Sequence, residues 1–415
     1  MPKALFIGYI WPEPQSSAAG LRTYNLLNTL RKNPWEILFT SAAKENDHTR
    51  SLHEHGIQTQ CIRTNDSSFD QLLTEVQPDF VFFDRFISEE QFGWRVQDAC
   101  PHAVRIIDTQ DLHFLRRIRQ RELKKQAPLE QLTQARFEFH EESVFREIAS
   151  LFRSDCSLII SSFERDLLKN RFHVPDALLH LHRFQYPEMK PTLPFKNRIH
   201  FAMIGNFRHA PNFDGVFWLK KELWPAIRKR LPQAQVHLYG AYPPQEIMAL
   251  HDPKTGFLIP GFTPDQHQTL AQYRVNLAPL RFGAGIKGKI TDGWWSGTPV
   301  VTTSLGAQGM ADGLPWGGAI SDDPEDFATK AVELHESLPD WQRAQQAGSE
   351  ILRQLYSEEP QASFLMQRLL KIQNNLNQHR RDNFTGAMLT YHLQRSDKYF
   401  SRWIEAKNRP SLIPD

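Results

Sequence analysis

The sequence has few cysteines, no long hydrophobic run and little net charge. Its three cysteines, Cys61, Cys100 and Cys156, lie far apart, which excludes a disulfide framework and a C-x-x-C metal site and is typical of a reducing compartment. No stretch approaches the roughly 18 consecutive apolar residues of a transmembrane helix. The formal net charge is +2, so we expect no nucleic acid partner. We predict a cytoplasmic protein, either free or peripheral to the inner face of a membrane.

Signatures of metal and cofactor binding are also missing from the sequence. The 17 histidines form no H-E-x-x-H motif and no Cys/His cluster, and Asp-x-Asp does not occur. We therefore expect neither a metal nor a cofactor. The N-terminal segment MPKALFIGYIWPEPQ has an apolar run that ends at Trp11, which is too short for the core of a signal peptide. We interpret this run as a first strand.

Two series of short apolar runs predict an α/β protein with two Rossmann-like domains. A chain of 415 residues is too long for one ordinary core. Near-continuous apolar runs separated by helix-length segments are typical of strands buried on both faces of a parallel sheet. The expected strands are Ala4–Gly8, Glu36–Thr40, Asp79–Asp84, Ala103–Asp108 and Cys156–Ser161, then Ile199–Ile204, Val236–Tyr239, Phe257–Ile259, Val275–Pro279 and Pro299–Thr303. Ligands of such domains bind beyond the carboxyl ends of the strands, so we expect an interdomain cleft.

Proline content and charge divide the chain further. The segment Phe184–Lys196 contains three prolines and is the predicted linker. We place the domains at residues 1–190 and 191–365, followed by C-terminal helices over 366–415. The basic tail Asn374–Asn408 has helical spacing and is expected to pack back on the first domain or to cover an acceptor or partner. The basic run Arg116–Lys125 predicts either a solvated helix face or a contact with an anionic acceptor or membrane surface.

The densest chemical signal lies between Asn276 and Gly309. Glycines 283, 285 and 288 fall at a strand-to-helix turn, where backbone N–H groups and the helix N-terminus can approach phosphate oxygens. Arg281, Lys287 and Lys289 place cations beside this turn, as a diphosphate requires. Asp292 follows one turn into the helix, where a carboxylate can accept hydrogen bonds from a ribose diol. This pattern predicts a nucleotide site.

This segment resembles the nucleotide-sugar site of GT-B glycosyltransferases, specifically the retaining family 4. In that family a Glu-x7-Glu motif precedes a Gly-x-Pro-Val-Val strand. Here the second glutamate position falls on Asp292 and the first on Ala284. The resemblance implies ribose binding by Asp292, and it assigns the sugar hydroxyls to the backbone around Gly283 and Ala284. Gly285 and the three cations are assigned to the donor diphosphate.

The resemblance also extends to two loops outside this segment. In IGNFRHAPNFDGVFWL, Arg208 is the candidate for a basic residue that contacts the diphosphate, whereas Asn212 lies near the position of a second family cation. Lys287 would then supply the missing charge. In the first domain, Gly20 is placed for its backbone N–H to meet the distal phosphate, with Arg22 beside it. The alternative is that Gly20 only lets the loop close before a helix.

The motif DTQDLH, residues 108–113, directly follows an apolar strand. Members of the family place a histidine or aspartate at this strand end, so His113 and Asp111 are the candidates for the reaction centre. Each of them could instead cap the following helix. The family mechanism is front-side attack in which the leaving phosphate takes the acceptor proton, so a dedicated enzyme base is not required.

We therefore predict a glycosyltransferase that moves a sugar from a nucleotide-sugar donor to an unknown acceptor, retaining and metal-independent. The acceptor is a glycan, a lipid-linked saccharide or another molecule, and an anionic or membrane-associated one fits the basic runs. Two alternatives remain open at this point. One is a nucleotide-sugar epimerase or hydrolase of the same fold, and the other is a non-catalytic scaffold of that fold that binds a partner.

Overall fold

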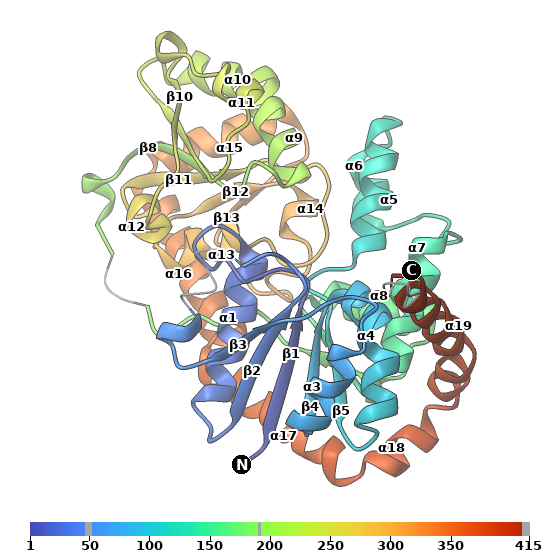
Figure 1. Ribbon diagram of the computed structural model, residues 1–415. Helices are drawn as coiled ribbons and strands as arrows, with labels where there is room; N and C mark the ends of the chain where they lie inside the picture. The colour runs from blue at the N-terminus through green and yellow to red at the C-terminus, as the bar shows by residue number, and fades with distance from the viewer. Residues whose placement is uncertain (46–51, 190–191, 409–415) are drawn as a thin grey trace, which may run out of the picture.

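The computed structural model describes residues 1–45, 52–189 and 192–408. It contains two parallel sheets, one in each half of the chain (Figure 1). The seven-stranded sheet has the order β3-β2-β1-β4-β5-β6-β7, and the six-stranded sheet has the order β10-β9-β8-β11-β12-β13. Helices cover both faces of each sheet, so the chain is an α/β protein with two Rossmann-like domains, as predicted.

The first domain begins with the strand read from the N-terminal apolar run. Its strands are β1 (Lys3–Gly8), β2 (Glu36–Ser41), β3 (Gln58–Cys61), β4 (Phe80–Asp84), β5 (Val104–Asp108), β6 (Cys156–Ile159) and β7 (Leu179–Leu181). Its helices are α1 (Ala18–Arg31), α3 (Ser68–Val76), α4 (Arg85–Ala99), α5 (His113–Lys124), α6 (Leu129–Gln134), α7 (Glu142–Arg153), α8 (Ser162–Phe172) and the short η1 (Asp176–Leu178). The central strands β4 and β5 are almost wholly buried, because helices cover them on both faces.

The second domain repeats this arrangement. Its strands are β8 (Ile199–Ile204), β9 (Val236–Tyr239), β10 (Phe257–Gly261), β11 (Tyr273–Ala278), β12 (Val300–Thr302) and β13 (Gly318–Ile320). Its helices are η2 (Phe195–Asn197), α9 (Ala210–Trp218), η3 (Leu219–Leu223), α10 (Trp224–Arg230), α11 (Gln245–Met248), η4 (Pro253–Thr255), α12 (Gln266–Leu270), α13 (Gly288–Trp295), α14 (Ser304–Ala307), α15 (Pro324–Glu336) and α16 (Leu338–Leu355). Trp294 on α13 is buried, and its indole N–H donates to the Gly317 carbonyl at 2.8 Å.

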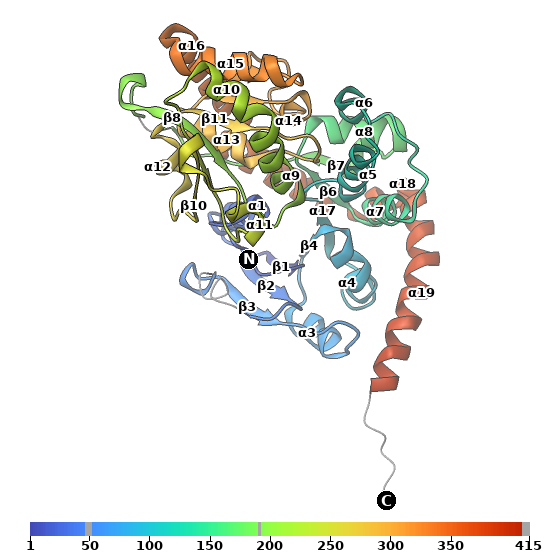
Figure 2. The same cartoon turned by 90° about the horizontal axis from the view of Figure 1, so that it is seen from above.

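The C-terminal helices cross back to the first domain, as predicted (Figures 1 and 2). They are α17 (Glu358–Asn374), α18 (Leu376–Asp382) and α19 (Phe384–Asn408), so the expected boundary at residue 366 falls inside α17. Leu365, Leu369 and Ile372 of α17 are buried in the first-domain core. In α18, Arg380 pairs with buried Asp155 at 2.7 Å, and α19 packs along α4 and α7. No helix in the described part of the chain is both long and apolar enough to cross a membrane.

Candidate active site

A cavity of about 550 Å³ lies between the two domains. Its walls are the segments that follow β1, β4 and β5 in the first domain and β8, β9, β10 and β11 in the second. The carboxyl ends of both parallel sheets therefore face the same space, which is where doubly wound domains bind ligands. The volume lies within the range of ordinary small-molecule sites.

The glycine-rich turn after β11 forms one wall of this cavity. Gly283 and Gly285 have φ angles of +150° and +63°, so both positions favour glycine. A Cβ on Gly285 would lie 2.9 Å from the Asp111 Cβ of the first domain, so the close approach of the two domains also requires glycine there. The helix expected after this turn is α13, which begins at Gly288 and directs its N-terminus at the cavity.

The structure separates the roles of the two lysines in the turn. Lys289 Nζ donates to Asn212 Oδ1 and lies beside Gly205, at the end of β8. Lys287 Nζ instead donates to the Gly285 carbonyl at 2.8 Å. The expectation that Lys287 supplies the charge missing at Asn212 is wrong, because Lys289 reaches that place.

Both lysines lie in the wall of the cavity, where Lys287 is buried and Lys289 is half-buried. The pKa of each is lowered to about 7, by burial for Lys289 and by burial together with the nearby Arg119 for Lys287. A bound anion would restore the charged form of these side chains.

The two arginines predicted near the diphosphate differ in their surroundings. Arg281 forms a two-point ion pair with Asp214 of α9, at 2.9 and 2.5 Å, and is not among the described residues that line the cavity. Its assignment to the diphosphate is corrected, since its guanidinium is held by a carboxylate outside the cavity. Arg208 does line the cavity, and its guanidinium lies 3.9 Å from the centre of the Tyr242 ring.

Asp292 lies one turn into α13 and lines the cavity. Its Oδ1 accepts a hydrogen bond from the Tyr186 hydroxyl at 2.6 Å, and the same hydroxyl lies 2.8 Å from Thr291 Oγ1. Burial raises the Asp292 pKa. Tyr186 belongs to the proline-rich segment, where we predicted only a linker, so sequence reasoning missed this partner. The available signal was its hydroxyl group, since Tyr186 is the one tyrosine of that segment.

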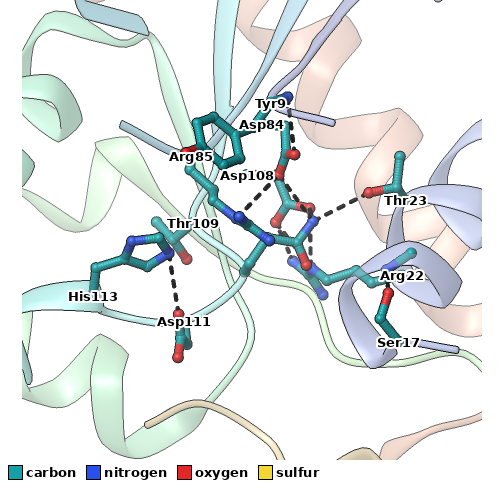
Figure 3. Close-up of polar contacts among 12 residues, drawn as sticks. Tyr9, Ser17, Arg22, Thr23, Asp84, Arg85, Asp108, Thr109, Asp111 and His113 are labelled. Carbon is teal, nitrogen blue, oxygen red and sulfur yellow. Dashed lines mark hydrogen bonds and ion pairs between the residues drawn. The ribbon is translucent and has the colours of Figure 1, made fainter. Parts of the chain in front are cut away.

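In the first domain, Gly20 lies in the first turn of α1, where it packs against the preceding loop. Its N–H donates to Ser17 Oγ at 3.1 Å, and a Cβ on it would lie 2.5 Å from the Glu13 backbone. The structure therefore favours the loop-closing alternative, and we withdraw the phosphate assignment of the Gly20 N–H. Residues 16–19 line the cavity instead, at the N-terminal end of α1. Arg22 is buried and pairs with Asp108 at 2.8 Å, away from the cavity (Figure 3).

Asp111 and His113 both line the cavity, next to each other (Figure 3). His113 Nε2 lies 3.4 Å from Asp111 Oδ1, and Arg116 Nε lies 3.0 Å from Asp111 Oδ2. Burial opposes ionisation of Asp111, but Arg116 and His113 hold its pKa below the usual value. Burial lowers the His113 pKa to about 4, so its imidazole is neutral at pH 7.

Two buried glutamates take the place of the N-cap that we considered for Asp111 and His113. Glu147 accepts the backbone N–H groups of His113 and Phe114, at 3.0 and 2.8 Å. Glu164 Oε1 accepts those of Leu112 and of Gly285, at 3.0 and 2.8 Å. The cap alternative is therefore not needed, and the Asp111 carboxylate faces the cavity.

Glu164 also joins the two domains, because Leu112 precedes α5 and Gly285 belongs to the glycine turn. With its N–H held by Glu164, Gly285 does not present that donor to the cavity, which corrects its assignment to the diphosphate. Gly283 and Ala284, assigned to the sugar, do line the cavity. Burial, together with the nearby Asp111 carboxylate, raises the Glu164 pKa to about 7.

Sequence reasoning also missed two cationic contributions to the site. Arg85, at the first position of α4, lines the cavity with a φ of +70° and lies 5.4 Å from the centre of the Tyr9 ring. Arg119, in the basic run after DTQDLH, is buried and donates to the Gly283 carbonyl at 2.8 Å. The run is thus not a purely solvated face. Within residues 1–45, 52–189 and 192–408, no group of three His, Cys, Asp or Glu side chains could hold a metal ion.

Comparison with known proteins agrees with this geometry. Residues 198–337 match the family model described as glycosyl transferases group 1. No curated protein matches the sequence significantly.

Similar solved structures extend over both domains. A sucrose-phosphate synthase from Thermosynechococcus elongatus is 14% identical, with a TM-score of 0.65 over 90% of this chain and 99% of that one. A glycosyltransferase from Rickettsia africae is 10% identical, with a TM-score of 0.68 over 90% and 99%. HepE from Anabaena, solved in complex with UDP, is 11% identical, with a TM-score of 0.65 over 89% and 100%. The likenesses to solved structures show that the two domains have the GT-B fold, and the family match over residues 198–337 indicates a glycosyltransferase.

Proposed function

We propose that the chain transfers a sugar from a nucleotide-sugar donor, with retention and without a metal ion, to an acceptor held by the first domain. One observation carries this proposal. The cavity brings the cations Lys289 and Arg208 and the carboxylate Asp292 to one wall, opposite Asp111 and His113 on the other. That arrangement matches a diphosphate, a ribose diol and a reacting sugar placed in series across the cleft.

The second domain holds the donor in this proposal. Lys289 and Arg208 bind the diphosphate, joined by the backbone N–H groups at the open end of α1, where the helix dipole favours an anion. Asp292 accepts hydrogen bonds from the ribose hydroxyls. The nucleobase occupies the part of the cavity lined by Gly240, Phe262 and Thr263, which follow β9 and β10. HepE bound to UDP, a structure of the same fold, supports a nucleotide in this cleft.

Lys289 and Arg208 supply, in this proposal, the positive charge that a metal ion provides at the diphosphate of other enzymes. As the bond from the sugar to the phosphate breaks, negative charge develops on the leaving oxygen, and fixed cations in a water-poor cavity stabilise it. Asp111, His113 and Arg116 line the opposite wall and position the transferred sugar and the acceptor. The neutral imidazole of His113 can donate one hydrogen bond and accept another. The leaving phosphate takes the proton of the acceptor hydroxyl.

A donor panel tests this proposal. UDP-, GDP- and ADP-sugars are screened for thermal stabilisation of the protein, for hydrolysis and for transfer to acceptor mixtures, with and without a chelator. The anomeric configuration of the product is read by NMR. Transfer with retention that survives the chelator supports the proposal. An isomerised donor sugar would instead indicate an epimerase, and the absence of any nucleotide-dependent stabilisation would indicate a scaffold.

A further inference from the structure

Helix α19 is anchored to the first domain along one face. Gly386 is buried, and a Cβ there would lie 2.1 Å from the Phe152 carbonyl of α7. Farther along, Ser401 is buried and accepts a hydrogen bond from Arg95 of α4 at 3.3 Å. Arg95 also pairs with Glu405 at 3.6 Å. These contacts fix the rotation of the helix about its own axis, so its opposite face points outward.

The outward face carries large apolar side chains. Of the twenty large hydrophobic side chains exposed in the described part of the chain, six lie on this single helix, and they are between 46% and 76% exposed. They are Phe384, Met388, Tyr391, Tyr399, Phe400 and Trp403. Five of the six are separated by four, three, eight and four residues, so they lie on one side of the helix: Phe384, Met388, Tyr391, Tyr399 and Trp403. Exposing so many large apolar side chains on one helix is unusual for a surface that faces only water.

The charges on α19 are divided between its two faces. Arg395 and Lys407 are exposed beside the outward rings, whereas the guanidinium of Arg402 lies 5.9 Å from the ring centre of Trp94 of α4. The Arg395 guanidinium lies 5.2 Å from the Tyr391 ring centre, and Lys407 Nζ lies 5.2 Å from that of Trp403. The two carboxylates of the helix interact with the body of the domain: Glu405 with Arg95, and Asp397 with Arg153. The outward face is therefore aromatic and cationic.

We propose that this outward face of α19 binds the surface of an anionic phospholipid bilayer. Tyrosine and tryptophan rings lie favourably at the level of the lipid headgroups, with their apolar parts toward the acyl chains. Arginine and lysine beside them meet the negative headgroups, and their long stems follow the apolar surface. The two-fold contact of a second copy would place the same cations against one another, which disfavours self-association through this face.

The position of α19 suits such docking. The helix runs along the outer side of the first domain, away from the second (Figures 1 and 2). A membrane on this side leaves the second domain free to move during donor exchange, while the acceptor domain stays on the surface. The proposal does not depend on the donor or on catalysis, since it concerns a surface remote from the cavity.

Vesicle sedimentation tests the proposal with the full chain. The probes are vesicles of phosphatidylcholine alone and of an equimolar mixture with phosphatidylglycerol. We expect binding to the mixed vesicles that falls steeply as salt is added. The double variants Tyr399→Ala/Trp403→Ala and Arg395→Gln/Lys407→Gln are each expected to weaken this binding by about tenfold or more.

Matched surface variants serve as controls. Leu338→Ala/Phe364→Ala removes two exposed apolar side chains elsewhere, and Lys221→Gln/Lys229→Gln removes two exposed cations of the second domain. Both should bind mixed vesicles as the unaltered chain does. Circular dichroism confirms folding of each variant. The proposal is overturned if the unaltered chain ignores anionic vesicles, if controls and α19 variants weaken binding equally, or if the α19 variants change only the oligomeric state.

Discussion

The two lysines of the glycine-rich turn should have separable functions. Lys289 Nζ lies at the end of β8 beside Gly205, whereas Lys287 Nζ is held at the Gly285 carbonyl, close to the first domain. Replacement by methionine removes the charge and keeps most of the side-chain volume. We predict that Lys289→Met weakens nucleoside diphosphate binding strongly and that Lys287→Met leaves it nearly unchanged.

The magnitude follows from the contact that is lost. A hydrogen bond between an ammonium group and a phosphate in a buried site contributes about 1.5–3 kcal/mol. Since about 1.4 kcal/mol is tenfold in Kd, Lys289→Met should weaken binding by about 10- to 150-fold. For Lys287→Met we expect a change in nucleoside diphosphate affinity of less than about threefold. Its main effect should be on the turnover of the complete donor, because its ammonium lies toward Glu164 and Asp111.

Titration calorimetry with UDP, GDP and ADP measures these affinities, using whichever nucleotide stabilises the unaltered protein. Arg281→Met is the matched control, because its guanidinium is engaged by Asp214 outside the cavity. It should bind nucleotide normally and lose at most about 1 kcal/mol of stability. If Lys287→Met abolishes nucleotide binding and Lys289→Met does not, the division of roles is wrong.

Three further predictions rest on buried titratable groups. Burial lowers the Lys289 pKa to about 7, so diphosphate binding at pH 8 should take up protons. This uptake should appear as a binding enthalpy that depends on the buffer and that Lys289→Met reduces. Equal enthalpies in phosphate and Tris, corrected for dilution, would contradict this prediction. Tyr186→Phe leaves Asp292 without its buried donor and should lower the free energy of unfolding by about 1–3 kcal/mol in urea titrations, and an unchanged midpoint would refute it. Because the folded-state pKa of Glu164 lies above its unfolded value, the unaltered chain should lose stability relative to Glu164→Gln as pH rises from about 4.5 to about 7; parallel stability curves would show otherwise.

The fold could be predicted because its strands are buried on both faces. Continuous apolar runs such as that of β4 are visible in a single sequence, and ten of the thirteen strands in the described part of the chain were placed. The three missed strands all lie at sheet edges. The edge strand β3 has the sequence QTQC, which lacks an apolar run because half of its backbone and most of its side chains face solvent. The strands β7 and β13 are only three residues long.

The candidate site was predictable only in part, for a reason specific to charged side chains. Sequence spacing places a backbone segment, so the turn, Asp292 and the strand end at Asp111 were found. It does not say which way a long side chain points. Arg281 lies beside the turn but pairs with Asp214, a residue 67 positions away. Glu164 accepts hydrogen bonds from backbone N–H groups of two domains, those of Leu112 and Gly285. No local sequence pattern predicts such a partner.

The return of α17 to the first domain has a consequence for how the protein is made. Leu365, Leu369 and Ile372 complete a core that otherwise consists of residues from the first half of the chain, such as Phe80 and Val104. On the ribosome, the second domain, residues 199–355, emerges in full before these three side chains do. The first domain to be synthesised is therefore the last to close its core. Until then, its inner surface is exposed to chaperones and proteases, which makes the interval before residue 372 the vulnerable stage of biosynthesis.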